Sequence, residues 1–225
     1  MSTIKLTLLE GPTTEKGTKT AQTVMKVKEL KELYDVHVYK REDGRVSKDA
    51  GYQREAEQKR IDKLAISLSK GLKVTNSITL NYRNPKFDLN FNKDGLANVE
   101  IPVEDKLWVI DGQHRTAAYL MLFDDADKYG LSQDTVGEYK LNVTLNWGAD
   151  IEEEVYAFYN INHFAKGIKL ENRMELNVFL SKRNIKTFDK SENLLLVDKV
   201  AERLHDDPIF NGKIRFANTK TGIAP

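Results

Sequence analysis

Cysteine is absent from the 225-residue chain, and a strong net charge is missing as well. Without cysteine the protein can hold no disulfide, no thiolate zinc site and no cysteine nucleophile. No apolar run approaches the roughly 20 residues of a membrane span, and the N-terminus lacks the apolar stretch of a secretory signal. The 35 basic residues nearly balance the 34 acidic ones. We therefore expect a cytoplasmic protein without a membrane partner, unlike the strongly basic proteins that coat duplex DNA.

Hydrophobic residues make up 40% of the chain, which is sufficient for one large domain or two small ones. Their spacing changes repeatedly between the two-residue period of strands and the longer period of helices. Strands are predicted at residues 4–9, 78–82, 107–110 and 141–147, helices at 53–70, 113–123, 150–159, 170–182 and 193–204, and polar loops at 11–20 and 84–99. This order predicts an α+β fold, a small mixed sheet flanked by helices.

The segment at residues 107–123, LWVIDGQHRTAAYLMLF, carries the most specific pattern in the chain. An apolar strand delivers Asp111 and Gly112 into a helix that begins near Gln113. Unpaired backbone N–H groups and the positive end of a helix dipole then face the turn, which attracts an anion. Gly112 permits close backbone approach, and Gln113, His114 and Arg115 supply donors. This arrangement predicts a phosphate-binding turn.

Asp111 is the carboxylate inside this segment. It is our candidate to hold Mg²⁺ or to accept a proton from an attacking water, with His114 as the second candidate for catalysis. The alternative is structural, because Asp-Gly is common in turns and an aspartate often accepts hydrogen bonds from its own turn. The apolar residues on both sides of the pentapeptide Asp-Gly-Gln-His-Arg favour the phosphate interpretation.

The pentapeptide and two flanking segments together resemble the DGQHR-domain family, whose members include DndB-like proteins, within the ParB/sulfiredoxin-like superfamily. The first flanking segment is Gly-Tyr-Gln-Arg at residues 51–54, and the second is Phe-Tyr-Asn-Ile-Asn at residues 158–162, with Lys166 downstream. The resemblance covers residues 36–183. It implies a ParB/sulfiredoxin-like fold and a role in DNA modification or phage defence. Sulfiredoxin's own reaction is excluded, since it needs a cysteine.

The resemblance also adds residues to the expected nucleotide site. Gln53 and Arg54 would open their helix beside the ligand, and Asn160, Asn162 and Lys166 would follow the Glu-rich helix in a polar loop. Each of these positions has a structural alternative, as a solvated helix start or as an asparagine at a helix end. The implied cofactors are a nucleoside triphosphate, with ATP, GTP and CTP left open, and Mg²⁺.

Three segments follow from this comparison. Residues 1–35 form an N-terminal extension, residues 36–183 the DGQHR ParB-like domain, and residues 184–225 a C-terminal helical segment. The chain ends without a helix cap, which leaves open that it is part of a longer protein. The number of copies in the assembly, a homo-oligomer included, is also left open.

Three functions are compatible with these features. The first is a nucleotide-binding domain, with NTP hydrolysis left open, acting in a DNA-modification or phage-defence system. The second is a DNA-binding transcriptional regulator without turnover, which would use a local basic face such as Lys59, Arg60, Lys63 and Lys70. The third is a ParB-fold nuclease or a small-molecule kinase, of which the metal nuclease is the weakest choice because a single aspartate provides no clear metal set.

Overall fold

The structure is a computed structural model that describes residues 2–14, 16–39, 41–42, 45–46, 51–72, 74–83, 85–164, 192–208 and 210. The chain divides into two compact units. The first unit comprises Met1–Val36 and Ala56–Phe158, and the second comprises His37–Glu55 and Tyr159–Pro225. The residues at the chain's start therefore belong to the same unit as residues 56–158.

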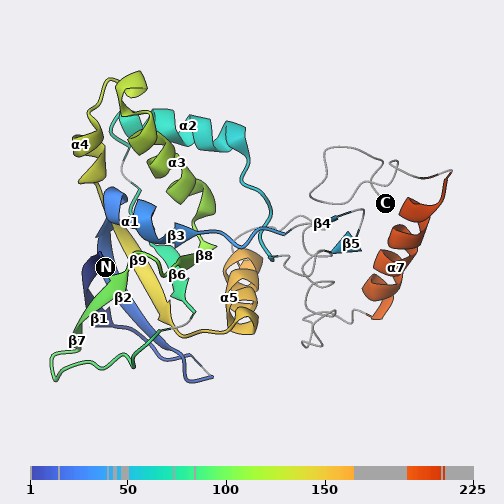
Figure 1. Ribbon diagram of the computed structural model, residues 1–225, viewed down its shortest axis with the longest axis horizontal. Helices are drawn as coiled ribbons and strands as arrows, with labels where there is room; N and C mark the ends of the chain where they lie inside the picture. The colour runs from blue at the N-terminus through green and yellow to red at the C-terminus, as the bar shows by residue number, and fades with distance from the viewer. Residues whose placement is uncertain are drawn as a thin grey trace. The chain divides into compact units, whose positions relative to one another are not determined.

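A seven-stranded mixed sheet forms the centre of the first unit (Figure 1). Its strands, in spatial order, are β3 (Tyr34–Asp35), β8 (Leu107–Asp111), β6 (Ile78–Tyr82), β9 (Lys140–Trp147), β2 (Lys19–Lys26), β1 (Thr3–Glu10) and β7 (Leu96–Pro102). The pairs β3–β8 and β6–β9 are parallel, and the other neighbours are antiparallel. The first two strands of the chain thus complete a sheet whose other strands come from residues 34–147.

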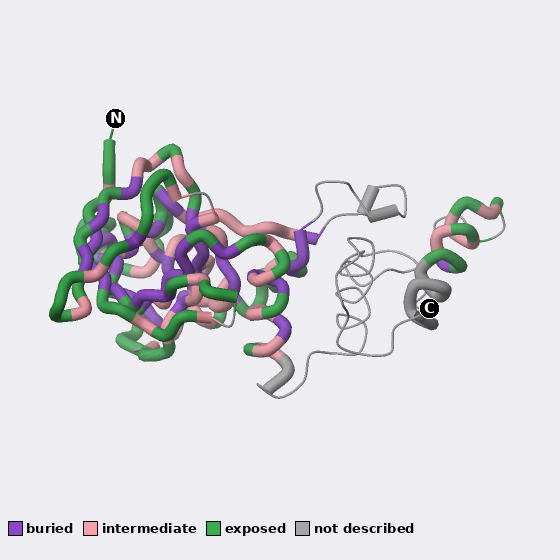
Figure 2. The backbone as a smooth tube through the Cα atoms, turned by 90° about the horizontal axis from the view of Figure 1, so that it is seen from below, coloured by how far each residue is buried: buried purple, intermediate pink, exposed green. Residues whose placement is uncertain are grey.

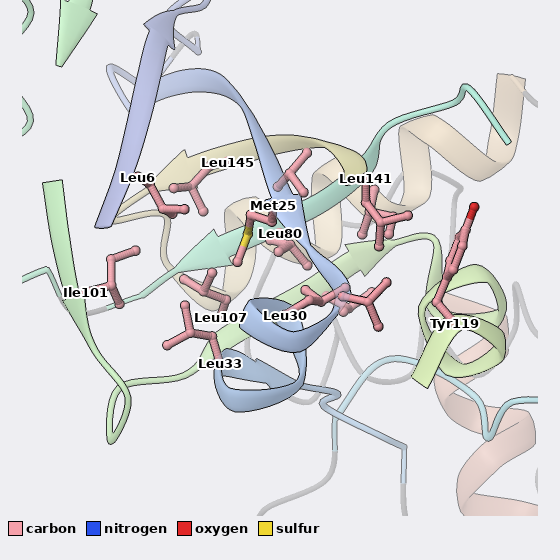
Figure 3. Packing of buried hydrophobic residues seen from close by; sticks show 14 of the residues in the cluster. Leu6, Met25, Leu30, Leu33, Leu80, Ile101, Leu107, Tyr119, Leu141 and Leu145 are labelled. Atoms are coloured by element: carbon pink, nitrogen blue, oxygen red, sulfur yellow. The ribbon is translucent and has the colours of Figure 1, made fainter. Parts of the chain in front are cut away.

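Helices form a layer on one face of this sheet, in which α1 and α3 contact the strands and the other helices pack against these two. They are α1 (Val27–Leu33), α2 (Gln58–Ser69), α3 (Gln113–Asp124), the 3₁₀ turn η1 (Ala126–Tyr129) and α4 (Gln133–Gly137). Alternate strand residues such as Leu80, Leu107 and Leu145 pack with Leu30 of α1 in one hydrophobic core (Figure 3). The tube in Figure 2 shows the same alternation as short buried stretches between exposed ones.

The opposite face of the sheet is more polar. The first turns of α5 (Ile151–Phe164) contact it where the buried Asn81 donates to Glu154. Towards β1, β2 and β7 the face is exposed, with Leu9, Val24 and Leu96 at the surface. The hydrophobic core therefore lies on the side of the sheet that carries α1, α2 and α3, and the contacts on the α5 side include buried polar groups.

The second unit contains fewer described elements. The strands β4 (Arg41–Glu42) and β5 (Arg45–Val46) pair antiparallel, Val38 forms a bridge with Gln53, and α7 spans Glu192–Asp206. Gly51 is required here because a Cβ would lie 1.9 Å from the backbone oxygen of His37. The predicted helix at residues 170–182 lies outside the described residues.

The structure confirms the mixed α+β class and corrects several element boundaries. The strands at 4–9, 78–82, 107–110 and 141–147 and the helices at 113–123, 150–159 and 193–204 are present. The predicted helix at 53–70 begins at Gln58, so Gln53 and Arg54 do not open it. The predicted loop at 84–99 ends early because β7 begins at Leu96, and β2 begins at Lys19, inside the predicted loop at 11–20.

The division at residues 35 and 183 and the ParB/sulfiredoxin-like fold stay predictions. Within the described residues, no helix is long and apolar enough to cross a membrane.

Candidate functional site

The turn between β8 and α3 has the geometry that the sequence indicated. Gly112 is the N-cap residue of α3 and has a φ of 95° in the left-handed region, which non-glycine residues rarely adopt. A Cβ at this position would lie 3.2 Å from Arg115 Nη2 and 3.2 Å from Ile78 Cγ1. The Thr116 N–H donates to the Gly112 carbonyl at 2.9 Å and begins the helix. Glycine is therefore required here both for its conformation and for its small size.

The Arg115 side chain folds back over this glycine. Its Nη2 donates to Asp111 Oδ2 at 2.8 Å, and its Nη1 donates to the Asn76 carbonyl at 2.6 Å. The two side chains of the ion pair are 18% and 33% exposed, respectively. A guanidinium has more N–H groups than these two bonds use, so Arg115 can also contact an anion at the turn. Such an anion would share Arg115 with Asp111.

His114 links the starts of two helices. Its Nε2 accepts a hydrogen bond of 3.1 Å from the backbone N–H of Glu57, the N-cap residue of α2. Nε2 therefore carries no proton in this arrangement, and the proton of the neutral ring is on Nδ1. Because His114 lies in the first turn of α3, this bond brings the N-termini of α2 and α3 together, on the same side of the sheet (Figure 1).

The starts of these two helices lack the usual acidic and capping side chains within the first turn, although Glu57 is the N-cap residue of α2. Neither α2 nor α3 has an acidic residue in its first turn, and neither N-cap side chain makes a capping hydrogen bond. Acidic and capping side chains are common there because they neutralise the positive end of the helix dipole. The first turns contain Lys59, Arg60, His114 and Arg115 instead. The junction thus combines two helix dipoles with the cations Lys59, Arg60 and Arg115, opposed by the carboxylates of Glu57 and Asp111.

Asp111 is the residue here that could bind a metal. Among the described residues there is no cluster of three or more His, Cys, Asp or Glu side chains placed to bind a metal ion. A metal at Asp111 would need phosphate oxygens and water as its other ligands, which is the usual coordination of Mg²⁺ with nucleotides. The Asp111 carboxylate would also have to weaken its ion pair with Arg115 in order to bind the metal. The residues fit a metal that arrives with a phosphate ligand.

The structure places the other predicted site residues in the second unit. Gln53 is 2% exposed, and its backbone bonds to His37 and Tyr39, whereas Arg54 is exposed. Asn160 and Asn162 lie within α5 and not in the loop we predicted, because the helix continues to Phe164. Lys166 lies outside the described residues. Asp111, Gly112, Gln113, His114 and Arg115 are together in the first unit, and the roles of all predicted site residues stay predictions.

A buried polar cluster was missed by the sequence analysis. Glu154 is fully buried and accepts from Arg83 Nε at 2.6 Å and from Arg83 Nη2 at 2.7 Å. Asn81 Nδ2 donates to Glu154 Oε1 at 2.6 Å, and the Arg83 guanidinium lies 4.0 Å from the centre of the Trp108 ring. The sequence offered a weak indication only, since Glu154 is one of three consecutive glutamates. The cluster anchors α5 to the sheet.

Comparison with known proteins identifies the family. The family model of DndB, described as DNA-sulfur modification-associated, matches residues 13–215 and therefore nearly the whole chain. No curated protein and no solved structure gives a significant match. The chain therefore belongs to the DndB family of DNA-sulfur modification-associated proteins.

Proposed function

We propose that the protein binds the phosphate groups of a nucleoside triphosphate where α2 and α3 begin. Membership of the DndB family implies a role in DNA phosphorothioate modification systems, and nucleotide binding would be the protein's own contribution to that role. The observation that supports the proposal is the 3.1 Å bond from Glu57 N–H to His114, which joins two helix N-termini without acidic first turns. Such a junction is suited to an anion with more than one phosphate.

The physical argument rests on summed partial charges. Each helix N-terminus is equivalent to about half a unit of positive charge, and this effect is confined to the first turn. Two such ends beside each other, with the Arg115 guanidinium over Gly112, favour a polyphosphate over a single carboxylate. Mg²⁺ bound to the phosphates would be close enough for Asp111 to coordinate it. Arg115, no longer paired with Asp111, could then contact the phosphates.

The contacts favour binding over turnover. A general base must accept a proton from the attacking water, but His114 Nε2 already accepts a hydrogen bond from Glu57. Asp111 is likewise paired with Arg115. Hydrolysis would require both bonds to rearrange, so the proposal is limited to nucleotide binding, and catalysis by Asp111 or His114 stays a prediction.

The experiment is a calorimetric titration of the protein with ATP, GTP and CTP in the presence of Mg²⁺. The expected result is binding of at least one nucleotide, weakened roughly 10- to 100-fold in Arg115→Gln because a charge-assisted bond to phosphate is lost. Lys70→Gln, which removes an exposed charge at the other end of α2, is the control and should bind as the native protein does. Thermal unfolding of each variant verifies the fold. If none of the three nucleotides binds, the proposal is wrong.

The second candidate is a DNA-binding regulator, and one observation bears on it. Three basic side chains of α2, Lys59, Arg60 and Lys63, are exposed, as is that of its C-cap residue Lys70. Duplex binding that occurs without nucleotide, weakens with salt and is lost in a Lys63→Ala, Lys70→Ala double variant but not in Arg115→Gln would favour this candidate. The overall charge of +1 gives it less support than the helix junction gives to nucleotide binding.

A further inference from the structure

The sheet of the first unit has one long open edge. β3, at one edge, has only two residues, whereas β7, at the other edge, has seven and, among the described residues, pairs with β1 alone. An exposed edge strand presents unpaired N–H and C=O groups and so serves as a template for pairing with strands of other molecules. An unprotected β7 edge would therefore allow strands of other molecules to pair with this sheet.

The ladder with β1 shows which residues of β7 face outward. Glu10 N–H donates to the Gly95 carbonyl at 2.8 Å, and Val103 N–H donates to the Ser2 carbonyl at 3.1 Å. Hydrogen-bonded pairs alternate along an antiparallel ladder, so the odd-numbered residues of β7 direct their backbone groups to β1. The even-numbered residues direct theirs away from the sheet: Leu96, Asn98, Glu100 and Pro102.

The chain itself satisfies the two ends of this outward row. At the start, the Leu96 N–H donates to Asn92 Oδ1 at 2.9 Å and the Leu96 carbonyl accepts from Asn92 N–H at 2.8 Å. At the end, Pro102 has no N–H, and its carbonyl accepts from Asp105 N–H at 3.0 Å. Only Asn98 and Glu100 then face outward without a neighbouring strand in the described part of the chain.

We propose that Asn92 acts as an edge lock, which together with the turn at Pro102 and Asp105 prevents strands of other molecules from pairing with β7. Asn92 occupies the position that a partner residue opposite Leu96 would take, and Asp105 blocks the equivalent position at the other end. The remaining window has two outward-facing residues. A neighbouring strand could therefore form at most four backbone hydrogen bonds with β7, through the N–H and C=O groups of Asn98 and Glu100.

Asn92→Ala tests the lock because it removes the Oδ1 acceptor of the Leu96 N–H. Asn92→Asp is the matched control, since a carboxylate oxygen can accept the same bond. A third variant combines Asn92→Ala with Asn98→Pro. The Asn98 N–H faces away from β1, so proline there blocks pairing without removing a backbone hydrogen bond of the ladder, and it removes only the exposed side-chain bond from Thr7 Oγ1 to Asn98 Oδ1. Self-association of all variants is measured by light scattering over a range of concentrations.

The expected result is that Asn92→Ala associates at lower concentration than the native protein and Asn92→Asp, and that adding Asn98→Pro abolishes the difference. The proposal is overturned if Asn92→Ala associates no more than Asn92→Asp, or if its association persists in the double variant, since the association then uses another surface or an unfolded state. Hydrogen exchange of the native protein is a second test. We expect a protected Leu96 amide and rapidly exchanging Asn98 and Glu100 amides, and protection of these two would contradict the lock.

Discussion

Gly112 is the residue on which the shape of the phosphate-binding turn depends most. Its left-handed φ allows β8 to enter α3 directly, and its lack of a side chain leaves room for Ile78 and for the Arg115 guanidinium. Glycine also occurs with a positive φ at Gly71, after α2, where no atom lies within 4 Å of a Cβ. The two glycines share a similar backbone conformation but differ in their surroundings.

A comparison of Gly112→Ala with Gly71→Ala separates these two requirements. A left-handed alanine costs about 1–2 kcal/mol, and this is the whole loss of unfolding free energy that we expect for Gly71→Ala. For Gly112→Ala we expect about 2–4 kcal/mol, because the methyl group also crowds Ile78. Denaturant unfolding measures both values. Equal losses would mean that the close packing at Gly112 is unimportant.

Glu138 makes stability depend on pH at low pH. Hydrogen bonds from Lys26 and from Lys28 lower the pKa of its carboxyl from 4.5 to about 2. A carboxyl with a lowered folded pKa stabilises the protein above its unfolded pKa, and this contribution disappears as the pH falls from about 4.5 to about 2. In Glu138→Gln we therefore expect a smaller fall in melting temperature between pH 5 and pH 2.5 than in the native protein. The effect should be small because the pair is exposed, and identical pH profiles would contradict the assignment.

At the scale of elements, the three glutamates at the start of α5 hold this helix in the first unit by contacts with different partners. Glu152 forms an exposed ion pair with Lys16, and Glu153 accepts from Thr14 and Thr18 in the loop between β1 and β2. Glu154 is fully buried in its bidentate pair with Arg83. The acidic run also favours the positive N-terminus of the helix. Sequence inspection could recognise that last effect but not the three separate partners.

Removing Arg83 should be far more damaging than removing Lys16. Arg83→Met leaves the buried Glu154 charge without its partner, and we expect a loss of about 3–5 kcal/mol in unfolding free energy. Lys16→Met breaks an exposed pair of 3.6 Å and should cost at most about 1 kcal/mol. The Arg83→Met, Glu154→Met double variant should recover part of the Arg83→Met loss, as measured by urea unfolding. A double variant less stable than either single variant would show that the pair itself is strongly stabilising.

Elements with strong local patterns were predicted correctly, and those defined by distant contacts were not. The alternation in β9 and the apolar strand before α3 depend on neighbouring residues, so they were visible in the sequence. β7 was missed because its outward residues include Asn98 and Glu100, which resemble a polar loop. α2 begins later than predicted because its start is fixed by His114, a residue far along the chain.

At the scale of the whole first unit, the site also has a part that depends on neighbouring residues and a part that depends on distant contacts. Residues 111–115 are adjacent in sequence, and their turn could be predicted from strand, glycine and helix signals alone. The meeting of α2 with α3 could not, because it depends on a contact between Glu57 and His114 that the tertiary fold creates. The predicted contributions of Gln53, Arg54, Asn160 and Asn162 assumed a helix start and a loop that the structure does not contain.

The measurement that tests the nucleotide-binding account most directly is a titration with inorganic triphosphate and Mg²⁺, followed by amide chemical shifts. The account predicts that the largest shifts occur in the first turns of α2 and α3, at residues 58–60 and 113–115, and that the nucleoside adenosine without phosphate leaves them unchanged. It also predicts that Arg115→Gln weakens the response. Shifts distributed elsewhere on the protein, or no shift in these two turns at saturating triphosphate, would contradict the central claim that the helix junction binds phosphate.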